Sequence, residues 1–167
     1  MNNRILLVAV IVGAILFLDQ LTKTLIAQNL EIGQHIPILP GFFDLTYMRN
    51  PGAAFSFLAR APEWFRQPFF LIATGVAIAA LLFFILYAQE EGTLLIVSAA
   101  SILGGAIGNL IDRLLYGEVI DFLLFYWRDW AWPAFNVADS CITLGVIGLL
   151  WASWRKPAVA PREQMST

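Results

Sequence analysis

The stretch VIDFLLFYWRDWAWPAFNVADS, residues 119–140, places two aspartates at the ends of a run rich in aromatic rings. Asp121 stands near its start and Asp139 near its end, and apolar segments of the chain flank both. A charged side chain at the centre of a bilayer costs about 2.5–3.5 kcal/mol on insertion scales. If the flanking apolar segments cross a membrane, the fold has to place these two carboxylates away from the bilayer centre.

The composition indicates a membrane protein. Of the 167 residues, 59% are hydrophobic and 13% are charged, whereas soluble domains carry about 25% charged residues. The net charge of −2 lacks the basic excess of nucleic-acid-binding proteins, so no nucleic-acid partner is expected. The apolar residues fall in four blocks, which predict transmembrane helices at about residues 5–26, 68–88, 93–115 and 137–155. We expect the whole chain, residues 1–167, to form one integral-membrane domain.

The positions of basic residues predict the orientation of these spans. Arg4 precedes the first helix and Arg155 and Lys156 follow the last, which favours both termini in the cytoplasm. The first block could instead be a secretory signal peptide, because a basic residue precedes a short apolar core. No small-residue cleavage site follows closely and the helical pattern continues, so we favour a transmembrane helix. The tail, about residues 157–167, is expected to be disordered.

Two connections would then face the outside, at about residues 28–67 and 116–136. The first contains HIPILPGFFDLTYMRN, residues 35–50, whose β-branched and aromatic residues predict short strands. It also contains PEWFRQP, residues 62–68, which is typical of a segment at the membrane surface. The second connection holds three tryptophans, a residue that prefers the headgroup region, so this loop is expected to lie along the bilayer.

Polar groups inside the apolar blocks form two clusters. Asp19 and Lys23 are four residues apart and share a helical face, where they could form an ion pair with Lys23 extending to the surface. Asn109, Asp112 and Arg113 could be a polar helix end that reaches water. A guanidinium and an amide could equally hold a carboxylate or a developing oxyanion. Nearby, the four-residue spacing of two glycines, Gly104 and Gly108, favours close helix packing.

Asp121 and Asp139 would lie at the same outer edge of the bilayer if their connection folds back. Alternatively, Asp139 only complements the dipole of a helix and Asp121 is a solvated loop residue. The chain has one histidine and one cysteine, which leaves no His/Cys metal site and no Ser–His–Asp triad. If the protein is an enzyme, carboxylates are its best acid–base groups.

Five motifs resemble those of the lipoprotein signal peptidase family, also called signal peptidase II. They are DQLTK (19–23), RNPGAAFSF (49–57), GGAIGNLIDRL (104–114), GEVIDF (117–122) and FNVADS (135–140). They cover nearly the whole chain, in the family's order and within its four-helix layout. The resemblance implies an all-α membrane protein of four transmembrane helices, with a small periplasmic β-sheet cradle and an interfacial helix.

The resemblance also implies a bacterial inner-membrane aspartyl endopeptidase. It would cut prolipoproteins just before their diacylglyceryl-modified cysteine, with its active site near the periplasmic face. Asp121 and Asp139 match the catalytic pair, which would share a proton and activate a water. Matches to positions that line or support the site are Asn50, Gly52, Asn109, Arg113 and Asn136, with Asp19, Lys23 and Asp112 at further polar positions of less certain role.

The expected partners are the lipidated precursor and membrane lipids, and the protein is expected to act as a monomer without a metal or other cofactor. One alternative is a small proton- or ion-translocating subunit that uses Asp19, Asp112 and Asp139. Against it stand the small number of spans and the lack of an evident inverted repeat. Another alternative is a structural scaffold in which the aspartates only tune helix packing.

Overall fold

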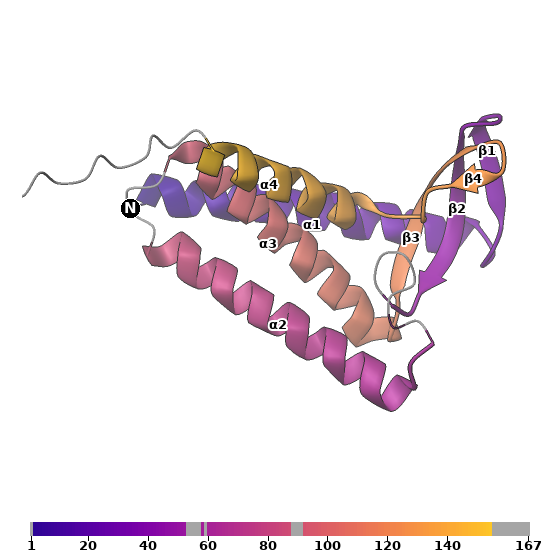
Figure 1. Ribbon diagram of the computed structural model, residues 1–167, viewed down its shortest axis with the longest axis horizontal. Coiled ribbons are helices and arrows are strands. Elements are labelled where there is room, and N and C mark those ends of the chain that lie inside the picture. The colour runs from indigo at the N-terminus through magenta and orange to yellow at the C-terminus, as the bar shows by residue number, and fades with distance from the viewer. Residues whose placement is uncertain (1, 53–57, 59, 88–91, 155–167) are drawn as a thin grey trace, which may run out of the picture.

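A computed structural model describes residues 2–52, 58, 60–87 and 92–154. Within this part of the chain the helices are α1 (Asn2–Asn29), α2 (Glu63–Tyr87), α3 (Thr93–Tyr116) and α4 (Val137–Trp154), and the strands are β1 (His35–Leu39), β2 (Phe43–Asn50), β3 (Val119–Trp127) and β4 (Trp130–Ala131). The helices form a bundle with the strands at one of its ends (Figure 1). All four helices are long and apolar enough to cross a membrane, which confirms the prediction of four such helices.

Helix α3 is the centre of the bundle and packs against the other three helices. In its most apolar segment 61% of the residues are buried, compared with 11% in each of the other helices. Small residues make this packing possible: a Cβ added to Gly104 would lie 3.1 Å from the Cβ of Ile15, and one added to Gly108 would lie 2.7 Å from Asp19 Oδ2. The close approach predicted for this glycine pair is confirmed, and α1 is its partner.

The strands form one antiparallel sheet in the order β1-β2-β3-β4. The strands predicted within residues 35–50 are confirmed as β1 and β2. No strand was predicted within residues 116–136, but Val119–Trp127 is a strand paired with β2. Its first four residues are buried under α1 and α3, so part of the aromatic stretch belongs to the interior.

The segment Glu63–Gln67 differs from the separate surface segment that we expected. It is continuous with the second transmembrane helix, and Pro68 lies inside α2 near its start. The described residues contain no separate interfacial helix. The positions 53–57 and 59, which carry part of the RNPGAAFSF motif, and the predicted disordered tail lie outside the described residues.

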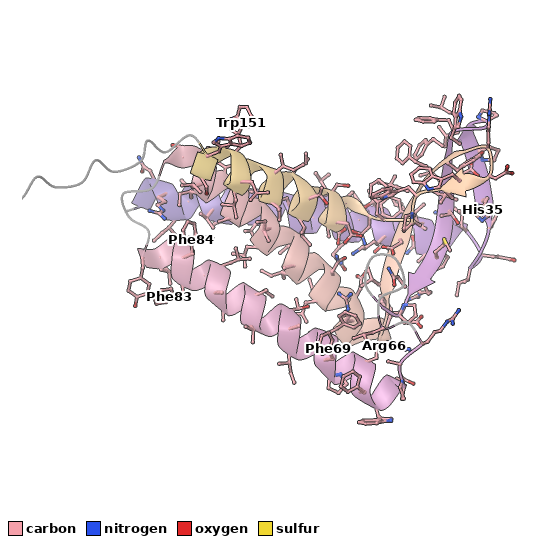
Figure 2. The ribbon with its side chains drawn as sticks, viewed as in Figure 1. His35, Arg66, Phe69, Phe83, Phe84 and Trp151 are labelled. Carbon is pink, nitrogen blue, oxygen red and sulfur yellow. The ribbon has the colours of Figure 1, made fainter. Side chains whose placement is uncertain are left out.

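The two ends of the bundle differ in character. The start of α1 and the end of α4 lie together at the end opposite the sheet (Figure 1). Trp151 is at that end of the molecule, whereas His35 is on the sheet (Figure 2).

Candidate active site

Asp121 and Asp139 meet where the sheet joins the bundle. Asp121 is the third residue of β3 and its side chain is 2% exposed, while Asp139 lies in the first turn of α4 and is partly exposed. Asn136 contacts both carboxylates: its Nδ2 donates to Asp121 Oδ1 over 2.8 Å, and its backbone N–H donates to Asp139 Oδ2 over 3.3 Å. The structure thus brings together the two aspartates that stand apart in sequence.

Asn136 also fixes Asp139 by capping α4. It immediately precedes the helix, and its Oδ1 accepts the backbone N–H of Asp139 over 2.8 Å. Together with the bond from the Asn136 N–H to the Asp139 carboxylate, this is a reciprocal capping box. The carboxylate also lies near the positive end of the helix dipole. The side chain of Asn136 is fully buried, so the geometry of the cap is closely constrained.

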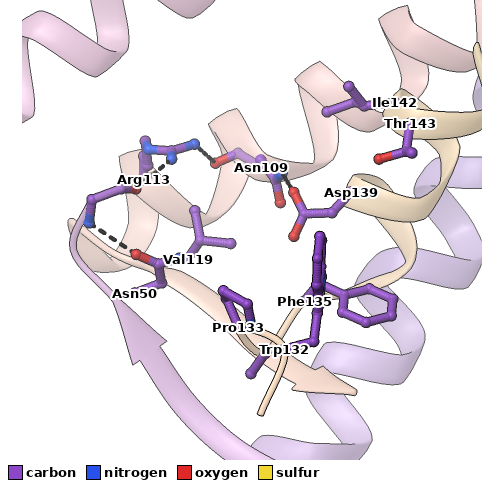
Figure 3. Close-up of a pocket in the computed structure, with 12 residues that line it drawn as sticks. Asn50, Asn109, Arg113, Val119, Trp132, Pro133, Phe135, Asp139, Ile142 and Thr143 are labelled. Carbon is purple, nitrogen blue, oxygen red and sulfur yellow. Dashed lines mark hydrogen bonds between the residues drawn. The ribbon is translucent and has the colours of Figure 1, made fainter. Parts of the chain in front are cut away.

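Three side-chain amides donate hydrogen bonds to the pair. Asn50 Nδ2 donates to Asp121 Oδ2 over 2.9 Å, and Asn136 Nδ2 donates to the other oxygen of the same carboxylate. Asn109 Nδ2 donates to Asp139 Oδ1 over 2.7 Å, a bond that Figure 3 shows. Hydrogen bonds to an ionised carboxylate stabilise its charge, so these amides favour a negative charge in the site.

Each amide is oriented by a donor behind its oxygen. Asn50 Oδ1 accepts the Gly52 N–H over 3.0 Å, and Asn136 Oδ1 accepts the Asp139 N–H. Asn109 Oδ1 accepts from Lys23 Nζ over 3.0 Å and from Asn136 Nδ2 over 3.2 Å. Backbone N–H groups and the Lys23 ammonium group cannot accept a hydrogen bond, so each amide presents its NH₂ group to the carboxylates.

Burial and, as a smaller cause, the nearby charge of Asp139 raise the pKa of Asp121 from its usual 3.8 to about 7. The hydrogen bonds from Asn50 and Asn136 act in the opposite direction. Two carboxylates in one poorly solvated site do not both ionise easily, so such a pair retains a proton near neutral pH.

Arg113 reaches the site through the loop after β2. Its Nη2 donates to the Gly52 carbonyl over 3.1 Å and its Nη1 donates to the Asn109 carbonyl over 3.4 Å. The guanidinium also lies 5.0 Å from the ring centroid of Phe70 in α2. Arg113 therefore ties this loop, which directly follows Asn50, to α3 and α2.

Asp19, Lys23 and Asp112 form a buried ionic cluster behind the amides. Lys23 Nζ lies 2.8 Å from Asp19 Oδ2 and 2.9 Å from Asp112 Oδ2. The Lys23 side chain is 1% exposed, so the alternative in which it extends to the surface is wrong. Sequence reasoning missed Gln20, whose Nε2 donates to Asp112 Oδ1 over 3.0 Å. The position of Gln20 inside the DQLTK motif could have indicated that it belongs to this cluster.

Two cavities border the pair. One of about 290 Å³ is lined by Asp139, Asn109 and Arg113, together with apolar side chains that include Ile142 (Figure 3). Another of about 200 Å³ is lined by Asp121 and Arg49. Both cavities share a wall formed by Asn50, Pro133 and Ala134. Sequence reasoning did not single out the two wall residues of the second connection, because nothing local marks an apolar residue as part of a cavity.

Known proteins match this chain over most of its length. The family model described as signal peptidase (SPase) II matches residues 11–155. The lipoprotein signal peptidase of Syntrophotalea carbinolica is 49% identical over 151 residues, which cover 90% of this chain and 91% of the relative. That of Geobacter metallireducens is 49% identical over 145 residues and covers 87% of each chain.

A solved structure has the same fold. It is described as a bacterial membrane enzyme structure by the in meso method at 2.3 Å resolution, with a TM-score of 0.76 and 32% sequence identity, and the match covers 95% of this chain and 96% of the other. The four-helix bundle, the antiparallel sheet and the sequence matches agree with one another. The chain therefore belongs to the signal peptidase II family.

Proposed function

We propose that this protein removes signal peptides from diacylglyceryl-modified prolipoproteins and that Asp121 and Asp139 activate the attacking water. Its family membership makes it an aspartic-type signal peptidase that processes lipoproteins. The observation that carries the assignment to this pair is the contact of one buried asparagine, Asn136, with both carboxylates. The raised pKa of Asp121 supports a pair that shares one proton.

In the proposed reaction the ionised carboxylate accepts a proton from a water as its oxygen bonds to the scissile carbonyl carbon. The protonated carboxyl donates its proton to the carbonyl oxygen, which yields a tetrahedral diol. As the diol collapses, the protonated carboxyl gives its proton to the amine while the C–N bond breaks, and the other carboxylate takes a proton from one diol hydroxyl. The products are a carboxylic acid and a free amine, and the pair again holds one proton. General acid–base catalysis of this kind contributes roughly 10²–10⁴-fold.

The larger cavity fits an apolar substrate. It places Asp139 beside apolar side chains such as Val119, Phe135 and Ile142. We propose that the signal peptide and the diacylglyceryl group approach through the lipid, where each buried methylene contributes about 0.8 kcal/mol. The cysteine-proximal bond would then reach the carboxylates without leaving the membrane boundary.

We further propose that the sheet end faces the periplasm, that both termini are cytoplasmic, and that the protein acts as a monomer surrounded by membrane lipids. The start of α1, whose sequence includes Arg4, lies at the bundle end opposite the sheet, in agreement with an excess of basic residues on the cytoplasmic side. The active site then lies near the periplasmic face of the bacterial inner membrane, where lipidated precursors emerge.

The test is incubation of the purified protein with a lipidated precursor and with the same precursor lacking the lipid. Mass spectrometry should locate a single cut before the lipidated cysteine. Asp121→Asn and Asp139→Asn should each abolish cleavage and still bind precursor. Asp44→Asn, which changes a buried aspartate of β2 away from the site, should cleave normally.

Cleavage by both active-site variants would reject the role of the pair. Ion flux in reconstituted vesicles, without any peptidase activity, would instead favour the alternative of an ion-translocating subunit.

A further inference from the structure

Each proposed catalytic aspartate follows a residue whose backbone N–H donates to a buried carboxylate. Asp112 Oδ2 accepts the N–H of Ile120 over 3.1 Å, and Ile120 precedes Asp121. Asp19 Oδ1 accepts the N–H of Ala138 over 2.9 Å, and Ala138 precedes Asp139. The side chains of Asp19 and Asp112 are at most 1% exposed, so water does not compete for these bonds.

Lys23 joins these two anchors. Its ammonium group lies within salt-bridge distance of Asp19 Oδ2 and Asp112 Oδ2, at 2.8 and 2.9 Å. A chain of contacts therefore runs from the start of α4 through Asp19, Lys23 and Asp112 to the start of β3. This chain connects the two segments that carry the pair by a route separate from Asn136.

The third contact of Lys23 is with Asn109. An ammonium group has three N–H donors, and Asp19, Asp112 and Asn109 Oδ1 provide an acceptor for each. If Asn109 turned over, its NH₂ group would face the ammonium and its oxygen would face Asp139. Both new contacts would be unfavourable, so Lys23 holds the amide donor toward the carboxylate.

We propose that Lys23 is a positioning residue of the peptidase reaction, which sets the separation of the two aspartate-bearing segments and the orientation of the Asn109 amide. The inference rests on the proposed function, and Lys23 itself touches no substrate. Catalytic groups have to be held within about 0.5 Å of their productive geometry. Backbone N–H groups orient the amides of Asn50 and Asn136, and a substitution does not remove them. The Asn109 amide is instead oriented by the side-chain ammonium group of Lys23, which a substitution can remove.

The test needs a variant that leaves no buried carboxylate without a counter-ion. Lys23→Met alone leaves two buried carboxylates without a counter-ion, which is strongly destabilising. The combined variant Asp19→Asn, Lys23→Met, Asp112→Asn is neutral and nearly isosteric. It also retains an amide oxygen to accept the N–H of Ile120 and of Ala138.

We expect this triple variant to fold, as measured by circular dichroism and thermal unfolding in detergent. Its kcat should fall roughly tenfold or more, with the KM for lipidated precursor little changed, because a transition-state interaction is lost. Its affinity for a peptide inhibitor that mimics the tetrahedral diol should fall by the same factor as kcat/KM. Purely structural residues would not produce this pattern.

A folded triple variant with unchanged kcat would overturn the inference. Failure of the neutral variant to fold would also overturn it, because the cluster would then serve folding rather than positioning. Ser98→Ala, a buried change in α3 near α4 and away from the pair, controls for disturbance of the bundle and should leave kcat unchanged.

Asp121→Asn and Asp139→Asn separate the two proposals. If these variants cleave normally, the role of the pair is wrong. If they are inactive while the triple variant keeps its kcat, only the role of Lys23 is wrong.

Discussion

At the scale of residues, the site consists of two carboxylates surrounded by three oriented amides. The motifs in the sequence predicted the residues named here for the site except Gln20, Phe70 and the cavity walls. What the sequence could not provide was the direction of each contact: that Asn136 bonds both aspartates, or that Lys23 points inward. These directions follow from burial, and burial depends on segments more than 80 positions apart, as for Lys23 and Asn109.

Asn109→Ala should reduce kcat by about tenfold to a hundredfold, because hydrogen bonds to charged groups contribute about 1.5–3 kcal/mol. This substitution removes Asn109 Nδ2, which donates a 2.7 Å hydrogen bond to Asp139 Oδ1. Steady-state kinetics on a lipidated precursor would measure the change in kcat. A change in KM alone would show that Asn109 serves substrate binding and not the transition state.

The pKa of about 7 for Asp121 predicts a pH dependence. Activity should decline as the pH rises through about 7, because the shared proton that protonates the carbonyl oxygen is lost. The sign for folding is the same: the folded state holds this proton more tightly than the unfolded state, so the stabilisation is fully present below the usual pKa of 3.8 and is lost as the pH rises through about 7.

Two substitutions should move the pKa of Asp121 in opposite directions. Asp139→Asn should lower it by removing a nearby negative charge, and Asn50→Ala should raise it by removing a hydrogen bond to the ionised form. Infrared titration of the carboxyl band in protein with isotopically labelled aspartate would measure both shifts. Shifts of the same sign would contradict the assignment of causes.

At the scale of elements, the four helices could be predicted from apolar block length alone, and their ends less well. The continuation of α2 back to Glu63 was not predicted, because Pro68 and the charges around it are typical of a break. Strand β3 was missed for a different reason. Its residues form an apolar and aromatic run without alternation, and only pairing with β2 selects the extended conformation.

Close packing of α3 against α4 gives a prediction about stability. A Cβ on Gly145 would lie 2.7 Å from the Ser98 carbonyl oxygen, so Gly145→Ala should lower the free energy of unfolding by about 1–3 kcal/mol. Gly75→Ala in α2 is the matched control, because a Cβ there meets nothing within 4 Å and alanine favours a helix. Chemical unfolding in detergent would compare them, and equal effects would contradict the packing argument.

At the scale of the whole molecule, the sheet and the two described chain ends occupy opposite ends of the bundle (Figure 1). This arrangement predicts opposite labelling by a membrane-impermeant maleimide in a Cys141→Ala background. Ile38→Cys, at an exposed position of β1, should react in intact spheroplasts. Asn3→Cys should react only after permeabilisation, and reaction of both in intact spheroplasts would contradict the proposed orientation.

The capping box of α4 has a consequence for inhibitors. In the proposed mechanism Asp139 belongs to the catalytic pair, and its carboxylate also completes the capping box of α4. Drug escape by replacing Asp139 would therefore cost both turnover and the stability of the start of a membrane helix. Escape mutations should instead accumulate at side chains that line the cavity without supporting the pair, such as Ile142 and Thr143. Compounds that bind chiefly through the carboxylates and spare those two positions should therefore select resistant strains least often.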